Sequence, residues 1–279
     1  MTDSDALRRR PSAAAAVKLV ALKEFRDCLR SRWLLFGSAL FAILSVAVFF
    51  GTAAIGGTLQ YQPLSSVMNS LLSLTVFLLP LLALLLCYDA FVGEAESGTL
   101  LLMLTYPLSR LQWLTGKAIG QGGAILLVLA AGFAVLPLIQ AFLPVPYGMG
   151  ELLGAMAVLI ATGWLLGLVF MLLAYWVSLT VRHKAQALAL LLVVWFTAVL
   201  LYDLALLVIS VAGADTLGRS ALTALMLANP ASVFRLINQA HLGILSFDVP
   251  PAWLLVGLLV LWSAVLFVIC AALLRSRRL

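Results

Sequence analysis

The sequence predicts an all-α polytopic membrane protein with six transmembrane helices. Of the 279 residues, 64% are hydrophobic and only 10% are charged, whereas a soluble domain is roughly 45–50% apolar and about 25% charged. Residues 33–88 contain no Lys, Arg, Asp or Glu, and this stretch is much longer than the ~20 residues that cross a bilayer as a helix. The apolar runs are continuous and do not alternate with polar residues, which favours helices over a β-barrel.

Windows of high hydropathy predict the individual spans. They cover roughly residues 33–51, 67–88, 118–141, 152–180, 185–211 and 252–274. Pro80 lies inside the second span and predicts a kink, and Pro137 lies near the end of the third. The third span is also rich in small residues that permit close helix contact, chiefly within one subunit: Gly120, Gly122, Gly123, Ala124, Ala130, Ala131 and Gly132. We therefore expect one transmembrane domain over residues 33–279, preceded by a cytoplasmic segment over 1–32.

The N-terminal segment carries a predicted amphipathic helix over residues 13–30, "AAAAVKLVALKEFRDCLR". Its composition favours a helix, and we expect the helix to lie flat at the inner headgroups of the membrane. At 100° per residue, the predicted apolar arc holds Val17, Ala21, Leu22, Phe25, Cys28 and Leu29. The predicted polar arc holds Lys23, Arg26, Asp27 and Arg30.

The longest predicted outer loop covers residues 212–250 and contains two short helical patterns. Asn229 followed by Pro230 is a helix start, with a capping side chain and a proline at the first helical position. Downstream residues then form one apolar face: Val233, Phe234, Leu236 and Ile237. We expect two re-entrant helices before the last span. The residues expected to meet a periplasmic partner, or to gate the outer exit, are Asn229, Pro230, Phe234 and Arg235.

The basic residues predict the orientation of the chain. Fifteen of the 17 Lys and Arg residues fall on one side of the predicted spans, and only Arg219 and Arg235 fall on the other. Because positive residues are retained in the cytoplasm, both termini are expected to be cytoplasmic. An even number of spans requires the two termini to lie on the same side of the membrane. The distribution of basic residues independently predicts the same arrangement.

Several kinds of chemistry are not predicted for this chain. A phosphate-binding P-loop has a Gly-Lys pair, with another Gly five positions before the Gly of this pair and a Ser or Thr directly after the Lys. Leu111 and Ala118 stand at those positions around Gly116 and Lys117. We therefore expect a chain that is not an enzyme and carries no cofactor. If its function is driven by ATP, a partner chain must bind the ATP and Mg²⁺. An intramembrane aspartyl protease is not favoured, because Asp89 and Asp203 are predicted at opposite faces of the membrane.

Metal, thiol and nucleic-acid functions are not predicted either. The two histidines lie on opposite sides of the predicted spans, and the seven methionines are scattered, whereas a copper path needs clustered soft ligands. Three cysteines do not form a disulfide framework, and we expect them to pack as small apolar residues. No metal site and no nucleic-acid partner are expected.

The most charged inner loop is "GEAESGTLLLMLTYPLSR", with a predicted short amphipathic helix over 93–105. It resembles a motif of ABC-2 type transporter permeases, through Glu94, Glu96, Gly98, Thr99, Leu100, Pro107, Arg110, Gly116 and Lys117. The resemblance implies a coupling helix that sits in a groove of a separate ATPase, in a complex with two copies of the permease. The coupling residues it implies are Glu94, Glu96, Gly98, Thr99, Leu100, Leu101 and Leu104, with Lys23 and Arg26 at a second contact.

Two stretches, "FVGEAESGTLLLMLTYPLSRLQWLTGK" and "ANPASVFRL", resemble the ABC-2 permeases of systems that mature nitrous oxide reductase. The resemblance implies a bacterial inner-membrane location, a cytoplasmic ABC ATPase and a periplasmic β-helical accessory protein. It also implies supply of a sulfur compound, or of conformational energy, for assembly of a copper-sulfur site. Two alternatives remain open, a mechanotransmitter without cargo and an exporter of lipid or drug.

Overall fold

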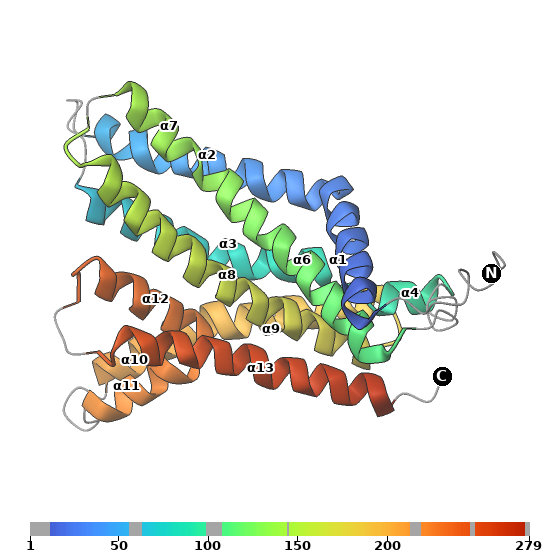
Figure 1. Ribbon diagram of the computed structural model, residues 1–279. Helices are drawn as coiled ribbons and strands as arrows, with labels where there is room; N and C mark the ends of the chain where they lie inside the picture. The colour runs from blue at the N-terminus through green and yellow to red at the C-terminus, as the bar shows by residue number, and fades with distance from the viewer. Residues whose placement is uncertain are drawn as a thin grey trace.

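The computed structural model describes residues 12–55, 63–98, 108–143, 145–212, 219–245 and 249–276. Every regular element in these ranges is a helix, and six helical segments are long and apolar enough to cross a membrane. The predicted all-α polytopic fold with six spans is therefore confirmed (Figure 1).

The spans lie close to their predicted positions. The first two are α2 (Arg32–Ile55) and α3 (Leu64–Cys87). The third comprises α6 (Arg110–Phe133) and α7 (Val135–Phe142), and the fourth is α8 (Met149–Thr180). The fifth comprises α9 (Lys184–Trp195), the π-helix η2 (Phe196–Leu201) and α10 (Tyr202–Ala212), and the sixth is α13 (Ala252–Ser276). The third span begins at Arg110 and not at residue 118, so Lys117 lies inside a helix.

The two prolines in the spans have different consequences. Pro80 stays inside the continuous helix α3. Pro137, in contrast, lies just after a break between α6 and α7 at Ala134. A proline has no N–H to donate to the carbonyl four residues earlier, and its ring clashes with that carbonyl. The affected carbonyl is that of Phe133, the last residue of α6, which explains where the helix ends.

Glycines of α6 allow other helices to approach closely. The N-terminal helix α1 (Ala13–Arg30) packs across α6. A Cβ atom on Gly116 would lie 2.6 Å from Cβ of Val20, and one on Gly120 would lie 2.5 Å from the carbonyl oxygen of Ala21. Larger residues at these two positions would push α1 away. Gly120 therefore serves packing within the chain, as predicted, whereas Ala130 and Ala131 of the predicted set are exposed.

The predicted helix over residues 13–30 is confirmed. Of its predicted apolar arc, Cys28 is buried, whereas Leu22 and Leu29 are exposed. Ala16 and Glu24, which lie outside that arc, are also buried. The buried face is determined by α6, whose glycines receive one side of α1 and whose Lys117 attracts Glu24. A hydrophobic pattern within α1 alone does not contain this information.

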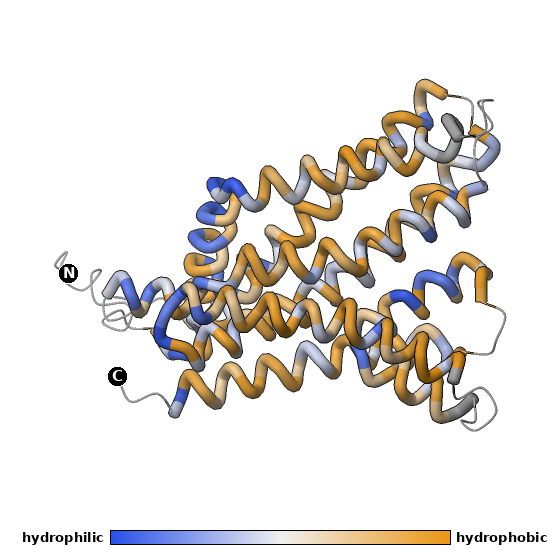
Figure 2. Tube along the Cα trace, turned by 180° about the vertical axis from the view of Figure 1, so that it is seen from behind, coloured by the Kyte–Doolittle hydropathy of each residue, from blue (hydrophilic) through white to orange (hydrophobic). Residues whose placement is uncertain are grey.

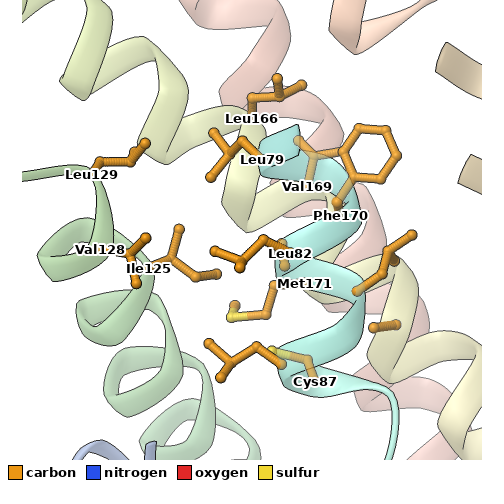
Figure 3. Packing of buried hydrophobic residues seen from close by; sticks show 14 of the residues in the cluster. Leu79, Leu82, Cys87, Ile125, Val128, Leu129, Leu166, Val169, Phe170 and Met171 are labelled. Carbon is orange, nitrogen blue, oxygen red and sulfur yellow. The ribbon is translucent and has the colours of Figure 1, made fainter. Parts of the chain in front are cut away.

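The helix α8 lies at the centre of the packing. It contacts α3, α6, α12 and α13, and its inner residues interlock with those of α3 and α6 (Figure 3). Fully or almost fully buried residues in this core are Leu79, Ile125, Val128, Leu129, Leu166, Val169, Phe170 and Met171. The fifth span is much less enclosed, since only 6% of its most apolar window is buried, against 61% for the segment that contains α3.

Two short helices precede the last span, as predicted: α11 (Arg219–Ala228) and α12 (Pro230–His241). The side chain of Asn229 accepts a hydrogen bond from the Ala231 N–H, and Pro230 occupies the first turn. In Figure 1, α11 and α12 lie at the end of the bundle opposite α1 and α4. Hydrophilic residues are concentrated on α1 and on α12, with apolar spans between them (Figure 2).

Candidate functional site

A polar pocket of about 310 Å³ lies where α1 meets the bundle. It is bounded by α1, the end of α3, the short helix α4 (Val92–Glu96), α6 and the first residue of α9. Figure 1 shows that α13 also ends at this side of the molecule. The lining includes seven ionisable carboxylates and amines: Lys23, Glu24, Asp27, Asp89, Glu94, Lys117 and Lys184.

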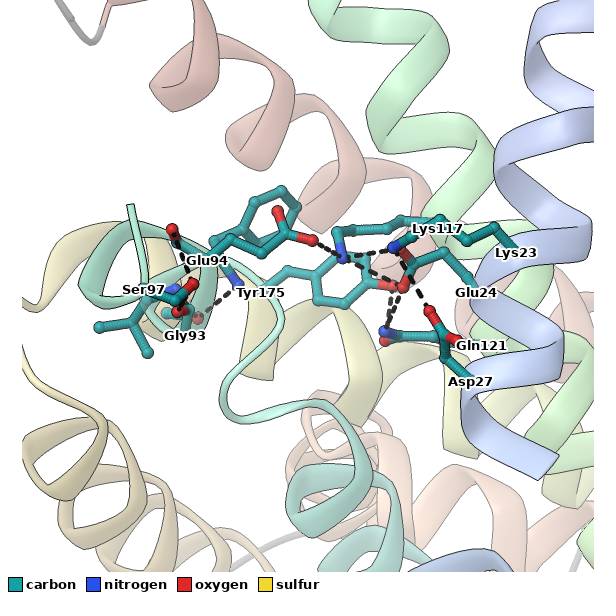
Figure 4. Close-up of polar contacts among 12 residues, drawn as sticks. Lys23, Glu24, Asp27, Gly93, Glu94, Ser97, Lys117, Gln121 and Tyr175 are labelled. Atoms are coloured by element: carbon teal, nitrogen blue, oxygen red, sulfur yellow. Dashed lines mark hydrogen bonds and ion pairs between the residues drawn. The ribbon is translucent and has the colours of Figure 1, made fainter. Parts of the chain in front are cut away.

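Lys117 is the central cation of the site (Figure 4). Its Nζ lies 3.0 Å from Oε2 of Glu24 on α1 and 2.9 Å from Oε1 of Glu94 on α4. The Lys117 side chain is only 3% exposed. Its ammonium also lies 5.7 Å from the ring centre of Phe91 and 5.8 Å from that of Trp113, distances at which an aromatic face attracts a cation.

Glu24 extends the cluster into the bundle. It also accepts hydrogen bonds from Lys23 and, at 3.1 Å, from Nε2 of Gln121. The hydroxyl of Tyr175 in α8 donates to Oε1 of Gln121 at 2.8 Å. Burial alone would raise the pKa of the Glu24 carboxyl, but attraction to Lys117 and Lys23 outweighs burial and holds this pKa below its ordinary value. Glu24 is therefore a carboxylate at neutral pH.

The helix α4 is fastened to the bundle by three sets of contacts. The N–H groups of Phe91 and Val92 both donate to Oγ of Ser178 in α8, at 3.1 and 3.0 Å. Glu94 pairs with Lys117, as described above. Glu96 accepts a hydrogen bond of 3.0 Å from the Lys184 N–H, at the start of α9. A five-residue helix has little stability of its own, so these contacts determine its position.

The structure locates some of the residues that were predicted to couple this chain to an ATPase. Glu94 and Lys23 line the pocket, Glu96 lies beside α9, and Arg26 is exposed on α1. Gly98 has a φ of +71°, a conformation that favours glycine. The other predicted coupling residues lie outside the described residues: Thr99, Leu100, Leu101 and Leu104. The part of the predicted helix 93–105 that is described runs to Glu96 and is followed by a turn at Ser97 and Gly98.

Glu24 and Lys117 form a hydrogen-bonded cluster with Gln121 and Tyr175. We did not predict this cluster from the sequence. A usable signal was present in α6, where Lys117 lies between Gly116 and Gly120. Two glycines four residues apart mark a face that a neighbouring helix approaches closely. A lysine beside that face must then be neutralised by an acid on the neighbour.

The residues predicted at the outer end lie inside the packing of the chain. Asn229, Pro230 and Phe234 are buried, and Nη2 of Arg235 lies 2.7 Å from Oδ2 of Asp203 in α10. The amide of Asn229 also donates to the Ala198 carbonyl in the π-helix η2. The side chains of Asn229, Pro230 and Phe234 thus have little exposed surface, whereas that of Arg235 is 28% exposed.

The remaining candidates stay apart or lack a ligand geometry. Asp89 follows α3 near the pocket, whereas Asp203 lies in α10 near the opposite end of the molecule (Figure 1). Among the described residues, no three His, Cys, Asp or Glu side chains are grouped so that they could hold a metal ion. The three cysteines are buried free thiols.

Six helices that are long and apolar enough to cross a membrane define a polytopic membrane protein. Residues 19–279 match the family described as ABC-2 family transporter protein, and the chain belongs to that family as a permease subunit. Two curated relatives share the name "Probable ABC transporter permease protein NosY". The one from Stutzerimonas stutzeri is 41% identical over 268 residues, which cover 92% of this chain and 97% of the relative. The one from Pseudomonas aeruginosa is 45% identical over 219 residues, which cover 78% of this chain and 80% of the relative.

Proposed function

We propose that this permease is moved by a separate cytoplasmic ATPase that binds the segment 93–105 and the exposed face of α1. The observation that best supports this proposal is the way in which α4 is attached to the bundle. Its two carboxylates contact Lys117 and the Lys184 N–H at the start of α9, while the residues from Ala95 to Gly98, Glu96 included, are exposed. A partner that pushes on this outer face would pass the force directly into α6, α8 and α9.

We also propose that two copies of the permease form the working unit in the bacterial inner membrane, with both termini in the cytoplasm. The fifth span is the least buried of the six, so its apolar surface is free to contact lipid or a second copy. Exposed residues along this span include Leu190, Val193, Leu204, Leu207 and Val208. The interior between α3, α6 and α8 is filled by side chains, so a path for cargo would run between the copies.

The proposed biological role follows the two NosY relatives and the sequence stretches that resemble permeases of nitrous-oxide-reductase maturation. In this role the chain supplies a sulfur compound, or conformational energy, for assembly of the copper-sulfur site of the reductase. A periplasmic β-helical protein would receive it at the outer end, near α11 and α12. The two alternatives, a mechanotransmitter without cargo and an exporter of lipid or drug, use the same inner-end coupling.

A strain that lacks this chain tests the role. Nitrous oxide reductase isolated from that strain is expected to lack the sulfide of its copper-sulfur site, and the wild-type gene is expected to restore it. A reductase with a complete copper-sulfur site in the deletion strain would contradict the proposed role. Transport and mechanotransmission are separated by covalently cross-linking the fifth spans of the two copies, which blocks a path between them. Continued maturation in the cross-linked complex would favour mechanotransmission.

A further inference from the structure

We propose that Lys117 is a positioning residue that joins α1 and α4 into one mechanical unit and connects that unit to α8. The inference rests on the proposed function, in which an ATPase contacts α1 and the segment that contains α4. It goes further by assigning the link between these two contacts to one buried ammonium group.

Lys117 lies between α1 and α4 and pairs with both. Lys117 contacts one carboxylate from each element, Glu24 from α1 at 3.0 Å and Glu94 from α4 at 2.9 Å. The Glu24 side chain is 6% exposed and that of Glu94 is 16% exposed. An ammonium with three N–H donors can bind two carboxylates at once. A displacement of α4 away from α1 must therefore break an ion pair that is largely shielded from water.

Packing alone would not require a charged side chain at position 117. Replacement of a buried ion pair by apolar residues of similar volume is often neutral or stabilising. The ion pairs instead fix relative positions, because each one determines where a carboxylate must lie relative to the ammonium group of Lys117. The rings of Phe91 and Trp113 lie on the same ammonium and restrict its movement further.

The cluster ends at Tyr175 in α8, one turn before the residue of α8 that holds α4. Lys117 and Gln121 are one turn apart on α6 and both contact Glu24. Gln121 in turn accepts a hydrogen bond from Tyr175. Ser178, one turn beyond Tyr175, accepts the N–H groups of Phe91 and Val92. A movement of α1 or α4 would thus reach residues 175–180 by two routes.

Hydrogen exchange followed by mass spectrometry tests the proposal on the full chain in lipid nanodiscs. For the chain alone, Lys117→Met is expected to speed amide exchange in both α1 and α4 by about tenfold or more, because charge-assisted contacts to both are lost. Lys117→Arg is expected to retain most of the protection. Asp27→Asn is the matched control, since Asp27 lines the same pocket but forms only a half-exposed pair with Lys23.

The complex with the ATPase provides the readout that a purely structural role would not change. Addition of ATP is expected to alter exchange at residues 175–180 in the wild type, in Lys117→Arg and in Asp27→Asn, but at least threefold less in Lys117→Met. If Lys117→Met fails to fold, Glu94→Gln tests the proposal in its place. This variant keeps the pair of Lys117 with Glu24, and it is expected to reduce the change in exchange at residues 175–180 on addition of ATP.

The outcomes separate the two proposals. Unchanged exchange of α1 and α4 in folded Lys117→Met, or an unchanged response to ATP in either variant, would overturn the role of Lys117. If no ATPase binds the wild-type chain, the proposed function fails, and the measurement on the chain alone still decides whether Lys117 joins α1 to α4.

Discussion

Lys117 is stable as a buried cation because two carboxylates contact it, those of Glu24 and Glu94. Uncompensated burial of one ion costs several kcal/mol even after relaxation, whereas a paired and hydrogen-bonded ion is tolerated. Removal of Lys117 therefore leaves these two carboxylates without their shared cation at the junction of α1, α4 and α6.

The pH dependence of stability should reveal Glu24. Because its pKa is lowered in the folded chain, its contribution is fully present above the ordinary value near 4.5 and is lost as the pH falls through the lower, folded value. We expect the thermal midpoint of the wild type to exceed that of Glu24→Gln at pH 7, and this difference to shrink as the pH falls below 4.5. A difference that stays constant as the pH falls further would contradict the assignment.

Cys28 is expected to be chemically inert. Burial, followed by the charge of Glu24, raises the pKa of its thiol to about 12, so only about one thiol in ten thousand is a thiolate at pH 8. Alkylation by iodoacetamide, followed by peptide mass spectrometry, should leave Cys28 unmodified in the folded chain and fully modified after denaturation. Rapid modification in the folded chain would show that α1 does not pack on α6 as described.

At the scale of helices, the contact of α1 with α6 depends on glycine. A Cβ atom at position 120 would lie 2.5 Å from the Ala21 carbonyl oxygen and 2.8 Å from Cβ of Glu24. We expect Gly120→Ala to destabilise the chain by about 1–3 kcal/mol through overpacking, measured as a lower unfolding midpoint in detergent. Gly257→Ala is the control, because no atom lies within 4 Å of its added Cβ. Equal midpoints for the two variants would argue against close α1–α6 packing.

The start of α12 is a second element whose stability depends on one side chain. Asn229 caps the helix through Oδ1 and donates from Nδ2 to Ala198. Asn229→Ala should cost about 1 kcal/mol for the cap and more for the lost contact with η2. Faster amide exchange throughout α12 is expected, with Asn229→Ser retaining part of the protection. Unchanged exchange in Asn229→Ala would mean that packing alone holds α12.

These elements show which features could be predicted from sequence and which could not. The start of α12 was predicted because Asn229 and Pro230 act through local backbone geometry. The six spans were predicted because each is a long apolar run. The burial of Glu24 in α1 was not predicted because it depends on Lys117 of α6, far away in the sequence. The π-helix at 196–201 has no local signal that we could identify.

At the scale of the whole molecule, polar interactions are concentrated at two ends of an apolar bundle. One end joins α1, α4, α6 and α8 through Lys117, and the other joins α10 and α12 through Asp203 and Arg235. The helices α6 and α8 extend from the first end toward the second (Figure 1). A force applied at the end that contains Lys117 therefore has a continuous helical route along the bundle, which is the property the proposed function needs.

Site-specific cross-linking tests the proposed coupling most directly. Ala95→Cys places a reactive group on the exposed face of α4, and Leu225→Cys places one on α11 at the opposite end. With a bifunctional reagent in membranes that contain both proteins, we expect the ATPase to be captured by the Ala95→Cys chain and not by the Leu225→Cys chain. Capture at Leu225→Cys alone, or no capture by a correctly inserted Ala95→Cys chain, would contradict an inner-end coupling site.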